Sequence, residues 1–109
     1  MIINFNKDNI KSIEDFLKLH DNVILLYFSD LCYHCNALKP TWIKLCKYFK
    51  NSNDVVIINA ESNNIKYFKK KYKNGLSGYP TILKYSNGKK MSEYVGKRDL
   101  ASLKKFVKK

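Results

Sequence analysis

Arginine is almost absent from this chain: of its 21 basic residues, 20 are lysines and only Arg98 is an arginine. Acidic residues are also few, 9 in 109, so the formal net charge is +12. Proteins that read nucleic-acid sequence rely on planar arginine forks, whereas lysine gives long-range attraction to acidic partners without a recognition code. We therefore expect a solvated lysine surface and no specific nucleic-acid partner.

Long apolar runs and paired cysteines are lacking too. No window holds 18 apolar residues in succession, which excludes a membrane-spanning helix and leads us to expect no membrane partner. Three cysteines, an odd number, exclude a scaffold that pairs all its thiols internally. Hydrophobic residues still make up 45% of the chain, enough for a core. We expect one folded domain over residues 1–109, acting as a monomer.

Targeting segments are not visible at either end. Residues 1–10 lack a basic stretch followed by an apolar one, and residues 104–109 (KKFVKK) carry no retention tetrapeptide. The expectation is a cytoplasmic protein. The abundance of residues with AT-rich codons (Lys, Asn, Ile, Tyr) fits a large DNA virus or an AT-rich protist as the source. In the case of a virus, the alternative location is the virion, with the protein packaged in it.

Periodicity predicts alternating strands and helices. The unbroken apolar run 23–28 (VILLYF) is typical of a strand buried on both faces of a parallel or mixed sheet. Further strands are expected at 2–5, 55–58, 81–85 and 91–95, and the Asn87–Gly88 dipeptide predicts a hairpin between the last two. Apolar residues at helical spacing predict helices at 8–19, 33–49, from Ser62 or Asn63 to 72, and after Asp99.

The resulting order is β-α-β-α-β-α-β-β-α. Alternation first and a hairpin last indicate an α/β fold, a mixed central sheet of about five strands with helices on both faces. Pro40 lies inside the second helix and should kink it without ending it, because the apolar stripe continues to Phe49.

The residues that carry chemistry follow the run 23–28 directly. Cys32 and Cys35 are two residues apart, where a long helix should begin. In an α/β chain without signs of secretion this placement is typical of a redox dithiol. Unpaired N–H groups at a helix start favour an anion, so Cys32 should have a lowered pKa and act as the nucleophile. Cys35, one turn further on the inward face, should resolve the mixed disulfide.

His34, between the two cysteines, should tune this chemistry. A donor with partial positive charge stabilises the reduced thiolate and makes the disulfide a better oxidant. Two alternatives stay open for the pair: a metal site, for which only Cys46 and His20 remain as further ligands, or two plain core cysteines. We expect neither a metal nor a cofactor.

Residues 32–42 (CYHCNALKPTW) resemble the active-site helix of thioredoxin-fold proteins, and more closely the protein disulfide isomerase pattern C-G-H-C-K-x-L-x-P-x-aromatic. Residues 78–81 (GYPT) stand where that family has its cis-proline loop, and residues 94–98 (YVGKR) match its Y-x-G-x-R pattern. The resemblance covers nearly the whole chain and implies a thioredoxin fold.

The resemblance also implies roles for further residues. A cis Pro80 would turn the backbone of Tyr79 toward the sulfur atoms and offer substrate an edge to pair with. Tyr33, which stands where the family has glycine, would shape the face that meets substrate. Arg98 matches the arginine that approaches the buried second cysteine and lowers its pKa.

The sequence departs from the family beneath the dithiol. The family's buried acid, six residues before the first cysteine, is Leu26 here, and the lysine of the next central strand is Ile57. Replacing both together leaves no unpaired buried charge. Because that acid relays the proton of the second cysteine, its loss puts fast turnover in doubt. The third thiol, Cys46, lies about 16 Å along the helix from Cys35, too far to pair with it. It should be a packed core residue, the alternative being a site of intermolecular disulfide formation or oxidation.

The first functional hypothesis is therefore a thiol–disulfide oxidoreductase of protein disulfide isomerase type, acting on protein disulfides or thiols. Its electron donor or acceptor would be a reductase, glutathione or a sulfhydryl oxidase. The alternative is a thioredoxin-fold binding or adaptor module whose dithiol is weak or vestigial.

Overall fold

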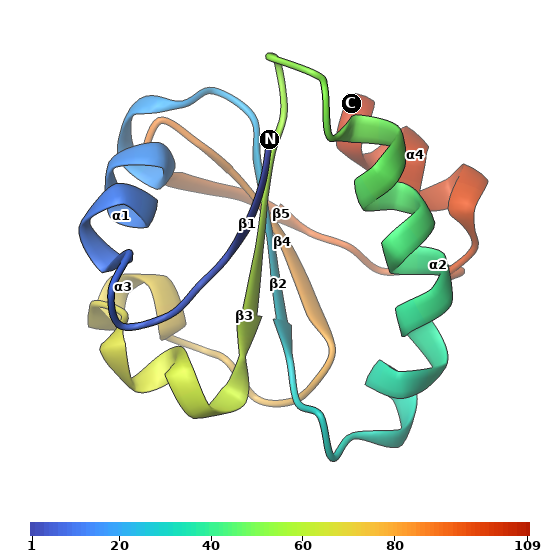
Figure 1. The fold of residues 1–109 in the computed structure, drawn as a ribbon, viewed down its shortest axis with the longest axis horizontal. Helices are drawn as coiled ribbons and strands as arrows, with labels where there is room; N and C mark the ends of the chain where they lie inside the picture. Colours follow the sequence, from blue (N-terminus) through green and yellow to red (C-terminus); the bar gives the residue numbers. More distant parts are fainter.

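The computed structural model describes residues 1–109 as a five-stranded sheet between two layers of helices (Figure 1). Its elements are β1 (Ile2–Asn4), α1 (Ile10–Leu19), β2 (Val23–Phe28), α2 (Tyr33–Phe49), β3 (Val56–Glu61), the 3₁₀ helix η1 (Ser62–Tyr67), α3 (Lys70–Lys73), β4 (Thr81–Ser86), β5 (Lys89–Glu93) and α4 (Leu100–Lys108). Helices α1 and α3 lie on one face, α2 and α4 on the other. The predicted α/β architecture is confirmed.

The strand order β1-β3-β2-β4-β5 places β2 at the centre of the sheet. Strands β1 and β2 run parallel to β3, whereas β4 is antiparallel to β2 and to β5. Five of the six residues of β2 are buried, as its unbroken apolar run predicts. Because β2 is held on both sides, the residues that follow it start from a fixed position.

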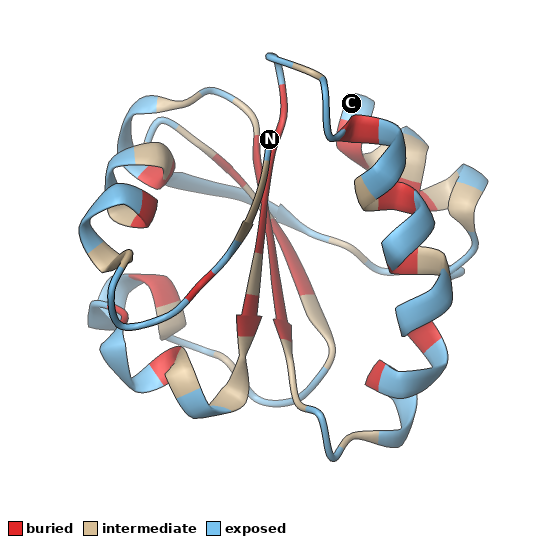
Figure 2. Cartoon of the chain, viewed as in Figure 1, coloured by how far each residue is buried: buried red, intermediate tan, exposed pale blue.

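The sheet divides the interior into two cores (Figure 2). On the α1 and α3 side, Phe5 stacks on Phe68 with ring centroids 4.0 Å apart, and Tyr27 meets Phe68 edge-on. The hydroxyl of Tyr27 donates to the backbone oxygen of Tyr72 at 2.5 Å, and burial raises the pKa of this phenol well above its usual range. This bond ties β2 to the helix α3 that precedes the 78–81 loop.

The other core lies between the sheet and helices α2 and α4. Helix α2 continues through Pro40 to Phe49, as predicted, and turns Leu38, Trp42 and Leu45 inward. Helix α4 begins where the sequence indicates: the Asp99 side chain accepts from the backbone N–H of Ser102 at 2.8 Å.

Two predicted elements need correction. Residues 62–72 do not form one helix, because the chain is extended at Phe68, whose ring packs into the core between η1 and α3. Their cap is Glu61, not Ser62 or Asn63. Strand β5 spans Lys89–Glu93 instead of 91–95. It begins early because the turn contains only Asn87 and Gly88, both at positive φ.

Candidate active site

The two cysteines of the motif lie at the junction of β2 and α2. Cys32 is the N-cap of α2, and its Sγ accepts a hydrogen bond from the backbone N–H of Cys35 at 3.3 Å. Cys35 is buried with 7% of its surface exposed, whereas Cys32 is partly exposed. One sulfur atom is therefore accessible to another protein and the other is shielded by the fold.

The surroundings separate the acidities of these thiols. The hydrogen bond from the Cys35 side chain, with further bonds from the backbone N–H groups of Cys35 and His34, lowers the pKa of Cys32. Burial, followed by the same hydrogen bond, raises the pKa of Cys35 to about 11. At neutral pH the thiolate therefore concentrates on the exposed sulfur atom.

We expect iodoacetamide at pH 7 to alkylate Cys32 at least about 100-fold faster than Cys35 or Cys46. The latter two have pKa values of about 11, so only about one in 10,000 of these thiols is ionised at that pH. Peptide mapping of the reduced protein over time measures the three rates. Equal labelling of Cys32 and Cys46 would contradict the assignment of Cys32 as the nucleophile.

The 78–81 loop faces the exposed sulfur atom. The Tyr79–Pro80 peptide bond is cis, and the Sγ of Cys32 lies 3.6 Å from the backbone oxygen of Tyr79. Around this contact the side chains of Leu31 and Tyr33 are 96% and 75% exposed. An accessible apolar surface therefore surrounds Cys32, as a site that receives a polypeptide requires.

His34 and Arg98 are both exposed. The ring of His34 packs edge-on against Tyr33, and it is the backbone N–H of His34 that acts on Cys32. The positive charge of Arg98 helps to lower the pKa of both thiols, as the weakest of several causes. The structure thus places Arg98 near the dithiol, and the tuning roles of both residues stay predictions.

Leu26 and Ile57, the two apolar substitutes for the family's charged pair, lie in the same core beneath α2, 5% and 0% exposed. In the register of β2 and β3, Leu26 lies opposite Asn59. Asn59 accepts from Nε1 of Trp42 at 2.8 Å and donates to Oδ1 of Asn4 at 3.1 Å. The residue paired with Leu26 on β3 thus carries an amide, which cannot take up a proton at neutral pH.

Two side chains that the sequence did not single out hold the loop before Cys32. A carboxylate oxygen of Glu61 accepts from the backbone N–H of Asp30 at 3.1 Å, and the amide of Asn36 donates to the backbone oxygen of Asp30 at 3.4 Å. Burial works against the charge of Glu61, but hydrogen bonds from Asn63, Asp30 and Ser62 hold the pKa of Glu61 below its usual range. The position of Glu61 at the end of a central strand is the only feature that could have indicated this role from the sequence.

Cys46 is a half-buried thiol packed against the core of α2, consistent with the predicted packing role. Burial raises the pKa of Cys46 from 9.0 to about 11. The Cys46 thiol therefore loses its proton at a lower pH in the unfolded chain than in the folded one. The contribution of the protonated thiol to the free energy of unfolding is complete below pH 9 and is lost as pH rises toward 11.

We expect the free energy of unfolding to fall between pH 8 and pH 10.5 by about 1 kcal/mol less in Cys46→Ala than in the wild type. Urea titrations at pH 8 and 10.5 measure it, and an equal loss in both proteins would contradict it.

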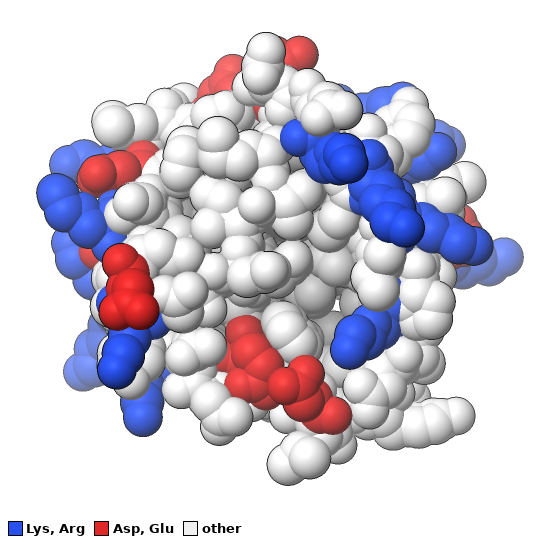
Figure 3. Space-filling model, in the orientation of Figure 1, with Lys and Arg blue, Asp and Glu red and all other residues white.

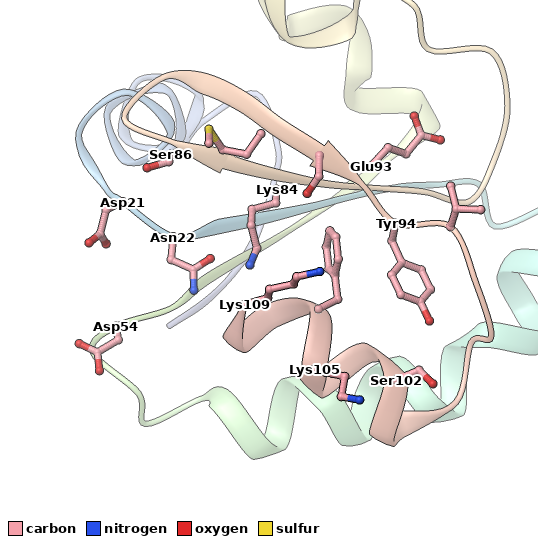
Figure 4. A pocket seen from close by; sticks show the side chains of 14 residues that line it. Asp21, Asn22, Asp54, Lys84, Ser86, Glu93, Tyr94, Ser102, Lys105 and Lys109 are labelled. Carbon is pink, nitrogen blue, oxygen red and sulfur yellow. The ribbon is translucent and has the colours of Figure 1, made fainter.

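A cavity of about 990 Å³ lies away from the dithiol. It lies between β5 and α4, at the end of the sheet where β2 begins (Figure 4). Lys84 and Lys109 point into it, while Asp21 and Asp54 lie toward one end. The ammonium group of Lys84 donates to the backbone oxygen of Val107 at 3.2 Å, where it stabilises the end of α4.

Few of the surface lysines form an ion pair with a carboxylate of the same chain. The one lysine–carboxylate ion pair joins Lys69 and Glu14 at 3.7 Å, and most other lysines extend into solvent over both flanks (Figure 3). No group of three His, Cys, Asp or Glu side chains is placed to hold a metal ion. None of the helices combines the length and apolar composition needed to cross a membrane.

The fold and the dithiol at the start of α2 define a class, the thioredoxin-fold dithiol proteins. The thioredoxin family model matches residues 3–109, and the chain belongs to that family. It is 33% identical over 107 residues to Protein disulfide isomerase-like 2-2 of Oryza sativa subsp. japonica, covering 97% of this chain and 28% of that protein. It is 34% identical over 88 residues to the Thioredoxin domain-containing protein 5 homolog of Drosophila melanogaster, covering 81% and 21%.

Among solved structures, human ERp44 form I superimposes with a TM-score of 0.79 and 24% identity, over 98% of this chain and 28% of that one. This likeness shows the fold. The chain spans about a quarter of the length of these relatives. It is a thioredoxin-family domain of protein disulfide isomerase type, as its sequence motifs indicated.

Proposed function

We propose that this protein is a thiol–disulfide oxidoreductase that acts on protein disulfides. The observation that carries the proposal is the pairing of a partly exposed Cys32, whose pKa is lowered, with a buried Cys35 one helical turn away. The backbone oxygen of Tyr79 beside Cys32 supports the binding of an extended substrate segment at the same place.

The chemistry follows from this arrangement. The Cys32 thiolate attacks one sulfur atom of a substrate disulfide, forming a mixed disulfide and releasing the other sulfur as a thiolate. Cys35 then loses its proton and attacks Cys32, so that the second substrate thiol leaves and a Cys32–Cys35 disulfide remains. The substrate gains two electrons and the protein loses two. In the opposite direction, the protein disulfide oxidises substrate thiols.

The reduction potential of the dithiol decides whether the protein reduces substrate disulfides or oxidises substrate thiols. Hydrogen bonds that stabilise the Cys32 thiolate favour the reduced protein, which makes its disulfide oxidising. We expect a reduction potential near about −180 mV, closer to protein disulfide isomerase than to the about −270 mV of thioredoxin. Equilibration with glutathione buffers measures it. A value below about −250 mV would refute the isomerase-like poise.

Insulin reduction tests the enzyme itself. Wild-type protein should reduce insulin in the presence of a thiol donor, and Cys32→Ser should not.

Leu26 and the raised pKa of Cys35 favour a second candidate function, a binding module with a weak dithiol. Inactivity of wild type and Cys32→Ser alike would support that module. A reductase, glutathione or a sulfhydryl oxidase would exchange electrons with the active enzyme.

A further inference from the structure

A second, smaller cavity adjoins the dithiol. It measures about 190 Å³ and lies between the sheet and the first half of α2, where Figure 3 shows a hollow in the surface. Its apolar lining is formed by Leu26, Phe28, Leu38, Trp42 and Ile43, and Cys35 lines it as well. The resolving cysteine therefore borders a space that is separate from the exposed face of Cys32.

The inner wall of this cavity offers a ligand few free polar groups. Nε1 of Trp42 and the amide of Asn59 are engaged with each other at 2.8 Å, and Asn59 also donates to Asn4. The charged lining residues, Asp30 and Lys39, are exposed and therefore belong to the mouth of the cavity. The interior is consequently suited to an uncharged group.

The cavity wall is apolar in large part because of Leu26. It lies on β2 between Asn59 of β3 and Ile82 of β4, and is 5% exposed. An acid at this position would hold water in the space, whereas leucine makes the wall apolar. An enclosed apolar cavity of about 150 Å³ binds single-ring molecules such as benzene. The present cavity is of similar size but opens to the surface at its polar mouth.

We propose that this cavity binds small, uncharged apolar molecules about one ring in size, and that the bound molecule shields Cys35. The volume of about 190 Å³ is below that of sites for larger ligands, about 300–1,000 Å³. A molecule seated there removes water from the Cys35 thiol and hinders formation of its thiolate. The binding itself does not depend on the proposed oxidoreductase activity.

Toluene is the probe, and Trp42 is the reporter, because it is the only tryptophan of the chain and lines the cavity. Titration of the reduced protein should change Trp42 fluorescence along a saturable curve. Anthracene, which is too large, and benzoate, which is charged, should give no such curve. A linear response to toluene, or equal binding of benzoate, would overturn the proposal.

A matched pair of surface variants tests the location. Ile43 and Tyr48 are both on α2 and similarly exposed, at 46% and 52%, but only Ile43 lines the cavity. Ile43→Glu should weaken toluene binding at least about 10-fold, since it places a charge against an apolar ligand. Tyr48→Glu should bind as the wild type does. Equal weakening in both variants would overturn the assignment to this cavity.

The effect on Cys35 has its own measurement. In Cys32→Ser, saturating toluene should slow the alkylation of Cys35 several-fold and leave that of Cys46 unchanged. Equal rates for Cys35 with and without toluene would overturn the shielding. None of these measurements uses a disulfide substrate, so an inactive dithiol would leave them intact and would be recognised separately in the insulin assay.

Discussion

Replacing Cys35 by serine is expected to stop turnover and leave Cys32 covalently bound to substrate. Cys35 lies one turn into α2, and its backbone N–H contacts the Sγ of Cys32, so its thiol is the group placed to displace a substrate bound there. Serine keeps the size but is not an adequate nucleophile toward a disulfide. Insulin reduction should fall at least about 100-fold, while Cys32 should still react at a rate close to that of the wild type.

Cys46→Ser is the matched control for this prediction. It removes a thiol from the same helix, eleven residues beyond Cys35 and about 16 Å away along the axis. It should neither slow turnover nor trap substrate. Mass spectrometry after mixing with a disulfide peptide detects the mixed disulfide in Cys35→Ser. Its absence there, or comparable trapping in Cys46→Ser, would show that Cys35 is not the resolving cysteine.

Replacing Leu26 by aspartate should accelerate resolution of the mixed disulfide by about 10- to 100-fold at pH 7. Leu26 and Cys35 line the same cavity, and the Cys35 thiol, with a pKa of about 11, has no buried base beside it. A carboxylate in that space would accept its proton. The same change should lower the free energy of unfolding by about 2–4 kcal/mol, because it buries an ionisable group without a cationic partner.

Leu26→Asn separates proton transfer from polarity. Asparagine has nearly the size and hydrogen-bonding capacity of aspartate but cannot act as a base at neutral pH. Stopped-flow measurement of substrate release from the mixed disulfide should show the gain with Leu26→Asp alone, and the gain should increase with pH as the introduced carboxyl group ionises. Equal rates in the two variants would mean that water already removes the Cys35 proton efficiently.

Much of the fold was predictable because local patterns and tertiary packing agree. The unbroken apolar run of β2 can be buried only as a central strand that is covered on both faces. The apolar stripe of α2 can be buried only if that side of the helix faces the core. Asp99 marks the start of α4 because its side chain can satisfy a backbone N–H that the helix itself leaves free. At residues 62–72 the local pattern was helical, but the core position of Phe68 required extended backbone.

The site was only partly predictable, for a different reason. Cys32 and Cys35 are neighbours in sequence, so their relationship could be stated from spacing alone. The bond between Trp42 and Asn59, and that between Glu61 and Asp30, join residues far apart in the chain and depend on the register of β2 with β3. Asn59 is the only polar residue among residues 55–60 (VVIINA), and the sequence does not show which residues it meets. The cavity beside Leu26 is a matter of shape, which sequence patterns do not encode.

The hydrogen bond from Tyr27 to Tyr72 has a consequence for the entropy of substrate binding. Tyr27 lies on the strand that leads to Cys32, and Tyr72 on the helix that leads to Tyr79, so one buried contact restrains both sides of the substrate site. Two surfaces anchored to the same point lose little conformational freedom when a polypeptide settles between them. The ordering cost of association then falls mainly on the polypeptide that binds there, which favours segments that are already held in an extended conformation before they bind.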